Sequence, residues 1–300
     1  MNGILVVNKP PDHTSHDVVA RLRGILRQKR IGHGGTLDPM AVGVLPVLVG
    51  QATRASAYLL GDKEYVAEAV FGFATDSQDI TGAVSARSDK RPSRMELERA
   101  LEGFRGPLLQ QPPMVSAVKV GGKKLVDLHR SGVEVERAPR TVTVYSLNLE
   151  DFSAQGCTLR AYVSKGTYIR TLVHDIGMAL GCYATLSALC RTKSEPYDLK
   201  QSHTLDDITG AAKLGLVHEL LLPLDSLFCE HPAVTVSGRA ELLCRNGNSF
   251  PSPFPSALCP PPGGLCRVYG ESGDFLMLGR VEKTPDGATQ IHPQKVFSPS

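Results

Sequence analysis

The chain has 300 residues, a length that allows about two domains and a large buried core. With 42% hydrophobic and 21% charged residues, its composition is typical of a globular protein. No apolar run approaches the roughly 18 residues that cross a membrane, and the N-terminal residues lack the basic leader and long apolar core of a signal peptide. The seven cysteines are odd in number and never form C-x-x-C, so we expect reduced thiols in the cytoplasm rather than a disulfide framework or a zinc finger.

The net charge of +3 is small, but the basic residues are clustered. Residues 21–30 carry five basic residues and no acid, and residues 119–140 carry six basic residues against three acids. Such clusters on a nearly neutral chain are typical of a surface that binds a polyanion. Solvent-exposed faces of helices and loops would show the same pattern, so charge alone leaves both interpretations open.

The first third of the chain alternates predicted strands and helices. A short buried strand is predicted at Gly3–Asn8, and a helix at Thr14–Gln28, where Thr14 and Asp17 have the spacing of a capping box. The glycine-rich stretch 31–39 cannot continue that helix and is predicted to be a loop. The elements expected next are an apolar strand or turn, a short helix, a strand and a helix with a second capping box, at 42–49, 51–60, 65–72 and 93–104.

The stretch 110–140 has no clean hydrophobic period and many charges, prolines and glycines, so we predict a long, partly mobile insertion. Paired strands and two helices follow, at 141–152, 157–163, 167–181 and 204–212. After about residue 231 the chain changes to short strands with turn signals, interrupted by a proline-rich loop. We therefore place a domain boundary near residue 230, with domains at 1–230 and 231–300.

The densest candidate for chemistry is the loop His33–Pro39, which presents Asp38 among glycines. Glycines let the backbone approach a ligand, and Pro39 favours an extended conformation at Asp38. An ordinary Asx-turn would look the same.

A second candidate is Ser164–Arg170, where a strand leads into a helix. Backbone N–H groups together with Lys165 and Arg170 could bind a phosphate or hold a carboxylate there, while a helix simply capped by Thr167 is the alternative. Tyr65 is a third candidate, although a tyrosine on a strand is most often part of the core.

Patterns for other chemistries are missing from the sequence. It has no P-loop, no H-E-x-x-H, no G-x-S-x-G and no G-x-G-x-x-G, and its nine histidines lack metal-ligand spacing. The interpretations that these motifs would support therefore fail.

Several stretches carry a family signature and occur in the family's order. They are GILVVNKP at Gly3–Pro10, GHGGTLDPMAVGVLP at Gly32–Pro46, KEY at Lys63–Tyr65, FGFATDSQDITG at Phe71–Gly82, QPPMVSAVKV at Gln111–Val120, RSGVEVERAPR at Arg130–Arg140 and SKGTYIRT at Ser164–Thr171. Over about residues 3–200 the chain resembles the bacterial TruB-type tRNA pseudouridine synthases. The tail after about residue 231 resembles, less specifically, the PUA-like RNA-binding domain of these enzymes.

The resemblance implies an α+β fold: a mixed, largely antiparallel sheet flanked by helices, a mobile thumb insertion at about 110–140, and a small β-rich PUA-like C-terminal domain. It also implies conversion of uridine to pseudouridine in the T-loop of tRNA, at the position conventionally numbered 55. The base would leave its stack, detach from the ribose, turn and rejoin through C5. That chemistry needs one carboxylate and neither a metal nor an organic cofactor. The resemblance implies that the partner is the tRNA T-arm, and that neither a membrane nor an obligate protein partner takes part. We take a monomer as the default oligomeric state.

The resemblance assigns roles to individual residues. Asp38 takes the position of the catalytic aspartate, Tyr65 that of the active-site tyrosine, and Arg170 that of the arginine that pairs with the aspartate. Asp38 would act as a nucleophile on the sugar or the uracil, or as a base at the sugar. Substrate-binding positions fall on Lys9, His33, Thr36, Arg54, Tyr168 and Leu189.

The chain departs from the family pattern at several positions outside the catalytic three. Arg54 stands where a lysine is common, and Val126, His129, Cys190 and Glu195 replace a usual tyrosine, alanine, arginine and glycine. These departures bear on how RNA is held. Two other hypotheses remain: a tRNA-folding chaperone with dispensable catalysis, and a related synthase for another RNA inside a guide-RNA complex, which the self-contained layout disfavours.

Overall fold

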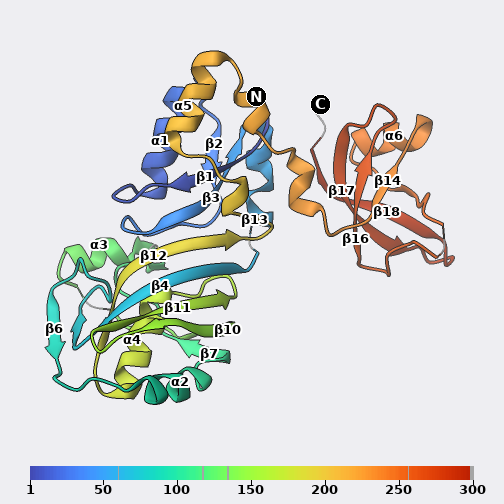
Figure 1. Ribbon diagram of the computed structural model, residues 1–300. Helices are drawn as coiled ribbons and strands as arrows, with labels where there is room; N and C mark the ends of the chain where they lie inside the picture. Colours follow the sequence, from blue (N-terminus) through green and yellow to red (C-terminus); the bar gives the residue numbers. More distant parts are fainter. Residues whose placement is uncertain (60, 117, 134, 256, 298–300) are drawn as a thin grey trace.

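The computed structural model describes residues 1–297 apart from 60, 117, 134 and 256, and within 119–130 it does not describe the side chains of 119, 120, 123, 124, 126, 129 and 130. The described chain contains two larger β-sheets that are separate in space (Figure 1). The first sheet is built from residues 3–198 and the second from residues 233–296. Val126 and His129, two of the positions that depart from the family pattern, are among the residues whose side chains are not described.

Nine of the described strands form the first sheet, in the order β1–β3–β12–β4–β11–β10–β7, with β2 paired to β3 and β13 paired to β12. Their bounds are β1 Gly3–Lys9, β2 Ile31–His33, β3 Val42–Val49, β4 Lys63–Phe71, β7 Gly106–Gln110, β10 Arg140–Phe152, β11 Gly156–Val163, β12 Ala184–Ser194 and β13 Tyr197–Asp198. All of its ladders are antiparallel except a short parallel contact between β12 and β3. The prediction of a mixed, largely antiparallel sheet is confirmed.

The period-2 burial of the central strands decides which side chains reach the interior. In β11 the residues Cys157, Leu159, Ala161 and Val163 are buried and alternate with half-exposed neighbours. The partner strand β4 alternates in the same way, which turns Tyr65 inward. At β4 and β11 the first sheet thus buries one of its two faces.

Six α-helices lie within the described residues, at α1 Ser15–Ile25, α2 Arg94–Glu102, α3 Leu125–Arg130, α4 Ile169–Leu180, α5 Leu205–Leu214 and α6 Gly238–Arg245. The predicted capping boxes of α1 and α2 are confirmed, and α5 has a third, between Thr204 and Asp207. Figure 1 shows α1 and α5 beside β1, and α2 and α4 beside the strands at the other end of the sheet. Short 3₁₀ helices occur at Gly50–Tyr58, Leu199–Gln201, Val217–Leu220 and Leu224–Phe228.

Three local predictions were wrong. Residues 31–33 are not part of the loop: they form β2, because their backbone pairs with Val47–Val49 at the edge of β3. Thr167 does not cap α4; Tyr168 takes that position without a side-chain cap, and the Thr167 hydroxyl donates to the Ser164 carbonyl instead. The helix α6 was not predicted, because we described the chain after about residue 231 as short strands with turn signals.

The insertion at 110–140 contains regular structure that its mixed composition hid. A two-stranded hairpin, β8 Lys119–Val120 and β9 Lys123–Lys124, leads directly into α3. Another short hairpin, β5 Phe73–Thr75 and β6 Val84–Arg87, lies near it, and Figure 1 shows α3 and β6 at the same end of the molecule. We keep the name thumb for residues 110–140.

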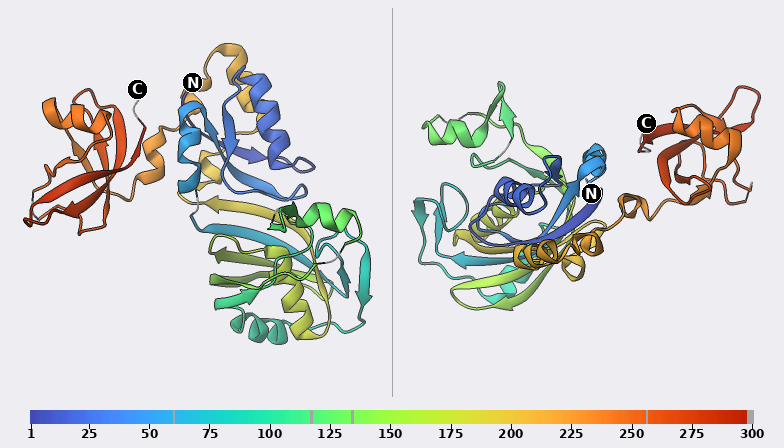
Figure 2. Two further views of the ribbon diagram at one scale, coloured as in Figure 1. Left: turned by 180° about the vertical axis from the view of Figure 1, so that it is seen from behind. Right: turned by 90° about the horizontal axis from the view of Figure 1, so that it is seen from above.

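The second sheet has the order β14–β16–β17–β18–β15 and a hydrophobic cluster of its own. Its strands are β14 Ala233–Thr235, β15 Phe250–Pro251, β16 Leu265–Tyr269, β17 Phe275–Lys283 and β18 Thr289–Val296. Both views in Figure 2 show this sheet to one side of the first. A small apolar cluster joins the two parts, where Ala55 and Phe228 pack with Leu278 and Phe297.

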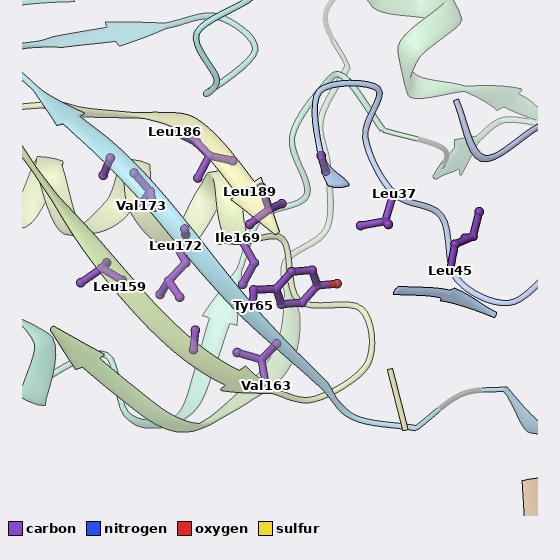
Figure 3. Close-up of a cluster of buried hydrophobic side chains, with 14 of the residues drawn as sticks. Leu37, Leu45, Tyr65, Leu159, Val163, Ile169, Leu172, Val173, Leu186 and Leu189 are labelled. Atoms are coloured by element: carbon purple, nitrogen blue, oxygen red, sulfur yellow. The ribbon is translucent and has the colours of Figure 1, made fainter. Parts of the chain in front are cut away.

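The main core lies between the first sheet and its helices and extends to the edge of a cavity. Figure 3 shows Tyr65 in this core with Val163, Ile169 and Leu189. Leu37, which precedes Asp38, belongs to the same cluster and is 3% exposed. The loop that carries Asp38 is therefore fixed to the core through its neighbouring residue.

Candidate active site

The loop that carries Asp38 is held from below by side chains of the first β-strand and the first helix. The Leu37 N–H donates to the Ser15 hydroxyl, at 2.9 Å, and Ser15 is fully buried at the start of α1. The Lys9 ammonium, also fully buried, donates to the Pro39 carbonyl at 3.0 Å and to two further carbonyls of the segment after β1. These contacts hold the backbone on both sides of Asp38, whose side chain stays partly exposed.

Arg170 contacts Asp38 through both carboxylate oxygens. Its Nε donates to Oδ2 and its Nη2 to Oδ1, each at 2.9 Å, which is the bidentate geometry of an arginine–carboxylate pair. Arg170 is 2% exposed, whereas the Asp38 side chain is 32% exposed. The pair thus has a buried cation behind a carboxylate that faces the cavity.

Backbone carbonyls and a second carboxylate complete the surroundings of Arg170. Its Nη1 donates to the Ser77 carbonyl at 3.0 Å and its Nη2 to the Val115 carbonyl at 2.8 Å. Asp79 Oδ2 lies 3.7 Å from Nη1, and Asp79 is itself buried. The remaining oxygen of Asp79 accepts from the Ser77 hydroxyl and the Thr81 N–H, so its orientation is fixed.

The sequence analysis did not identify Asp79 as a site residue. Asp79 lies in the stretch Phe71–Gly82, which we used only as a family marker. The signal that could have found it is an acid followed two residues later by Thr81, a spacing that suits an Asx-turn and a fixed carboxylate. Nothing in the sequence pairs that acid with an arginine about ninety residues later.

A cavity of about 290 Å³ opens in front of the ion pair. Six of the residues predicted for the site line it: Thr36, Asp38, Tyr65, Tyr168, Arg170 and Leu189. Leu189 on β12 and Tyr65 on β4 are both nearly buried and come from adjacent strands. The cavity therefore offers an apolar wall opposite a carboxylate, which suits a flat ring with polar edges.

Tyr168 is positioned from the root of the thumb. The Gln110 side chain brackets its backbone, accepting from the Tyr168 N–H at 2.7 Å and donating to the Tyr168 carbonyl at 3.0 Å. The Arg140 guanidinium lies over the Tyr168 ring, 5.6 Å from its centroid. Both ends of the thumb thus contact the residue that caps α4.

Three predicted substrate-binding residues do not line the cavity. Lys9 lies beneath the Asp38 loop, as described above, and Arg54 is exposed on the 3₁₀ helix that follows β3. The His33 ring packs edge-on against the His16 ring with centroids 5.1 Å apart. Burial, followed by the nearby His16 and Arg191, lowers the pKa of His33, which favours its neutral form.

A larger cavity, of about 700 Å³, lies between the end of α1 and α5, and none of the candidate residues lines it. Within the described part of the chain, no group of three or more histidine, cysteine or acidic side chains has an arrangement that could hold a metal ion. No described helix is long and apolar enough to cross a membrane. We therefore take the cavity at Asp38 as the candidate active site.

Comparison with known proteins gives consistent matches. Residues 23–169 match the family model described as "TruB family pseudouridylate synthase (N terminal domain)", and residues 170–228 match "tRNA pseudouridylate synthase B C-terminal domain". The chain is 51% identical to tRNA pseudouridine synthase B of Symbiobacterium thermophilum, over 82% of each chain. It is 43% identical to the enzyme of the same name from Moorella thermoacetica, over 98% of this chain and 99% of the relative.

Solved structures agree with these matches. The chain is similar to one in a Cbf5–Nop10–Gar1 complex, with a TM-score of 0.74 and 28% identity, over 99% of this chain and 85% of the other. It is also similar to one in an H/ACA ribonucleoprotein bound to a substrate RNA containing 2′-deoxyuridine, with a TM-score of 0.75 and 26% identity over the same shares.

Proposed function

This chain belongs to the TruB family of pseudouridylate synthases, and from that premise we infer that it isomerises uridine to pseudouridine in tRNA. We propose that its target is the uridine at conventional position 55 in the T-loop. The observation that carries the proposal is the bidentate Arg170–Asp38 pair at the edge of a cavity with an apolar wall.

In this proposal the target uridine leaves its stack, at a cost of a few kcal/mol, and enters the cavity. Tyr65 and Leu189 contact the base, and Asp38 reacts at the sugar or the base while Arg170 holds its carboxylate in one orientation. Tyr65 is also a candidate for proton transfer at the isomerised product. The base then rejoins C1′ through C5, and the C5 hydrogen leaves as a proton.

The arrangement of carboxylates suits isomerisation better than hydrolysis. A glycosidase places two carboxylates on either side of the bond, and in many cases one of them activates water. Here the second carboxylate, Asp79, is buried on the far side of Arg170 and accepts hydrogen bonds from Ser77 and Thr81. It is not placed to activate water, so the detached uracil remains available to rejoin the ribose.

The remaining parts of the chain extend the proposal to tRNA. The thumb would close on the T-arm, because its two ends already contact Tyr168 at the cavity. Residues 231–300 would form a PUA-like domain that binds RNA, and residues 1–230 the catalytic domain. Lys9, His33, Thr36 and Arg54 would act in RNA binding, with Lys9 doing so through the Asp38 loop. We propose a cytoplasmic monomer that needs no protein partner and no cofactor.

Tritium release from a T-arm RNA labelled at C5 of uridine tests the proposal. Wild-type protein should release tritium, because C5 loses its hydrogen only when the new bond forms, and Asp38→Asn should bind the RNA and release none. A tRNA-folding chaperone with dispensable catalysis would tolerate Asp38→Asn. Comparing the T-arm with other RNA hairpins tests the substrate, and absence of release from the T-arm by wild type would contradict it.

A further inference from the structure

The cavity at Asp38 carries more positive charge than its one carboxylate balances. Four cationic side chains line it, and Asp38 is the acid among its lining residues. Arg170 pairs with Asp38, which leaves Lys63, Lys165 and Arg191. These three come from β4, from the loop before α4 and from β12.

Arg191 is fully buried, and within the described part of the chain its hydrogen bonds go to backbone carbonyls. Its Nε donates to the Val44 carbonyl at 2.7 Å and its Nη2 to the Gly35 carbonyl at 3.1 Å, while its Nη1 is buried without a partner. A buried cation whose hydrogen bonds go to carbonyls rather than to an anion carries a desolvation cost that the carbonyls offset only in part. An anion near this wall would lower that cost.

Lys63 extends the positive charge from Arg191 to the open cavity. Its ammonium donates to the Gly61 carbonyl at 2.6 Å. Burial first, and then the charge of Arg191, lower the pKa of Lys63 to about 8; Lys165 acts in the same direction, and the acids Asp62 and Glu195 oppose the shift in part. The two lysines and Arg191 therefore repel one another, which an anion bound between them would relieve.

Gly35 lies beside both Lys63 and Arg191 and has no side chain of its own. A Cβ at Gly35 would lie 3.4 Å from Lys63 Cε and 3.5 Å from Arg191 Nη1. Gly35 has a φ of +78°, a left-handed conformation that favours glycine. No side chain of residue 35 therefore fills the space beside the Lys63 and Arg191 side chains.

We propose that Lys63 and Lys165 bind one phosphodiester of the RNA backbone beside the flipped uridine, with Arg191 supplying buried positive charge beneath them. This inference rests on the proposed function, because a flipped uridine brings its own two phosphates to the mouth of the cavity. Lysine is suited to this contact as a point charge with rotatable donors. The contact holds the backbone and leaves the base free to turn in the cavity.

The test uses a T-arm RNA in which one linkage next to the target uridine, on its 5′ or its 3′ side, is an uncharged methylphosphonate. When the contacted one of these two linkages is the methylphosphonate, wild-type protein should bind the RNA about tenfold more weakly, because one charge-assisted contact is lost. Lys63→Met should bind the unmodified RNA about tenfold more weakly, and neutralising that linkage should weaken its binding less than it weakens wild-type binding, because Lys165 alone still contacts the phosphate. With unmodified RNA its KM should rise while kcat changes little.

Lys213→Met is the matched control, because Lys213 lies on α5 and lines the other large cavity. It should respond to the neutral linkage as wild type does. Lys165→Met repeats the test with an exposed residue, and thermal unfolding of each variant checks that it is folded. The slope of log K against log salt should fall by about 0.7 to 0.9 for each lysine variant, as for one lost phosphate contact.

Two results would overturn the proposal. One is that neither neutral linkage weakens RNA binding by the wild type. If inorganic phosphate nevertheless competes with RNA for the wild type and not for Lys63→Met, the site binds free phosphate only, and the proposal is still overturned. The other is that Lys63→Met remains as sensitive to the neutral linkage as wild type. Because binding is the readout, absence of tritium release from the wild type would refute the proposed function separately from the phosphate contact.

Discussion

Replacing Arg170 by lysine keeps the positive charge but removes the fork of donors that orients Asp38. Arg170 makes four side-chain hydrogen bonds, two to Asp38 and one each to the carbonyls of Ser77 and Val115. A lysine ammonium is a point charge and cannot span a carboxylate and two carbonyls that face different guanidinium nitrogens. We expect two of these acceptors to lose their donor.

The magnitude follows from burial. Each orphaned buried acceptor costs about 1–3 kcal/mol, so the variant should lose about 2–6 kcal/mol of stability. At about 2–4 °C per kcal/mol for a domain of this size, a loss of about 3 kcal/mol lowers Tm by about 6–12 °C. Turnover should fall by about 100-fold, because Asp38 is no longer held in its reactive orientation.

Single-turnover tritium release and thermal unfolding measure the two effects, and tRNA affinity should stay within a few-fold of wild type because the charge is retained. Arg170→Met is the companion variant. It leaves Asp79 buried without the cation beside it and should cost about 3–5 kcal/mol, an amount within the range expected for the lysine variant. An Arg170→Lys protein with wild-type Tm and wild-type turnover would refute the assignment of Arg170 as the group that orients Asp38.

Three further predictions test neighbouring parts of the site. Asp79→Asn should lower turnover about tenfold with unchanged tRNA affinity, because it removes the second carboxylate beside Arg170; equal turnover in stopped reactions would count against that role. Gly34→Ala should destabilise the fold by about 1–3 kcal/mol in chemical denaturation, because its Cβ would lie 2.7 Å from Leu59 Cβ. Burial lowers the pKa of Lys9 to about 8 from 10.5, so between these pH values the unfolded chain binds more protons and stability rises with pH. The Tm of wild type minus the Tm of Lys9→Met should therefore increase from pH 8 to pH 10. A Tm difference that stays constant over this range would contradict the lowered pKa of Lys9.

Local chemistry made the helix starts predictable. The spacing of Thr14 and Asp17 specifies the first turn of α1 without reference to the rest of the chain, and the same holds for Ser93 and Glu96 at α2. Thr167 failed as a cap because the Gln110 side chain, from another part of the sheet, already binds the backbone of the next residue. A contact from a distant strand overrode a local preference.

The parts of the candidate site whose chemistry depends on a side chain could be predicted from the sequence. The parts formed by backbone carbonyls could not. Asp38 on a glycine-rich loop stood out by its residue types. The carbonyls of Ser77 and Val115 have no sequence signature, because any residue offers the same carbonyl. Arg170 was a candidate by its residue type, and the resemblance paired it with Asp38. Its neighbour Asp79 required the folded arrangement, in which Asp79 forms a bridge with Leu186 of β12.

The hydrogen bonds of Arg170 connect segments that are far apart in the sequence. Its partners lie 132, 93 and 55 residues away, in the Asp38 loop, in the turn at Ser77 and at Val115 in the thumb. The loop and the turn belong to the body of the first domain, but Val115 belongs to a segment that the tRNA would contact. A thumb movement that displaces the Val115 carbonyl changes the hydrogen bonding of the same Nη2 that holds Asp38 Oδ1. We therefore expect the orientation of Asp38 to depend on the position of the thumb, because one guanidinium nitrogen donates to both.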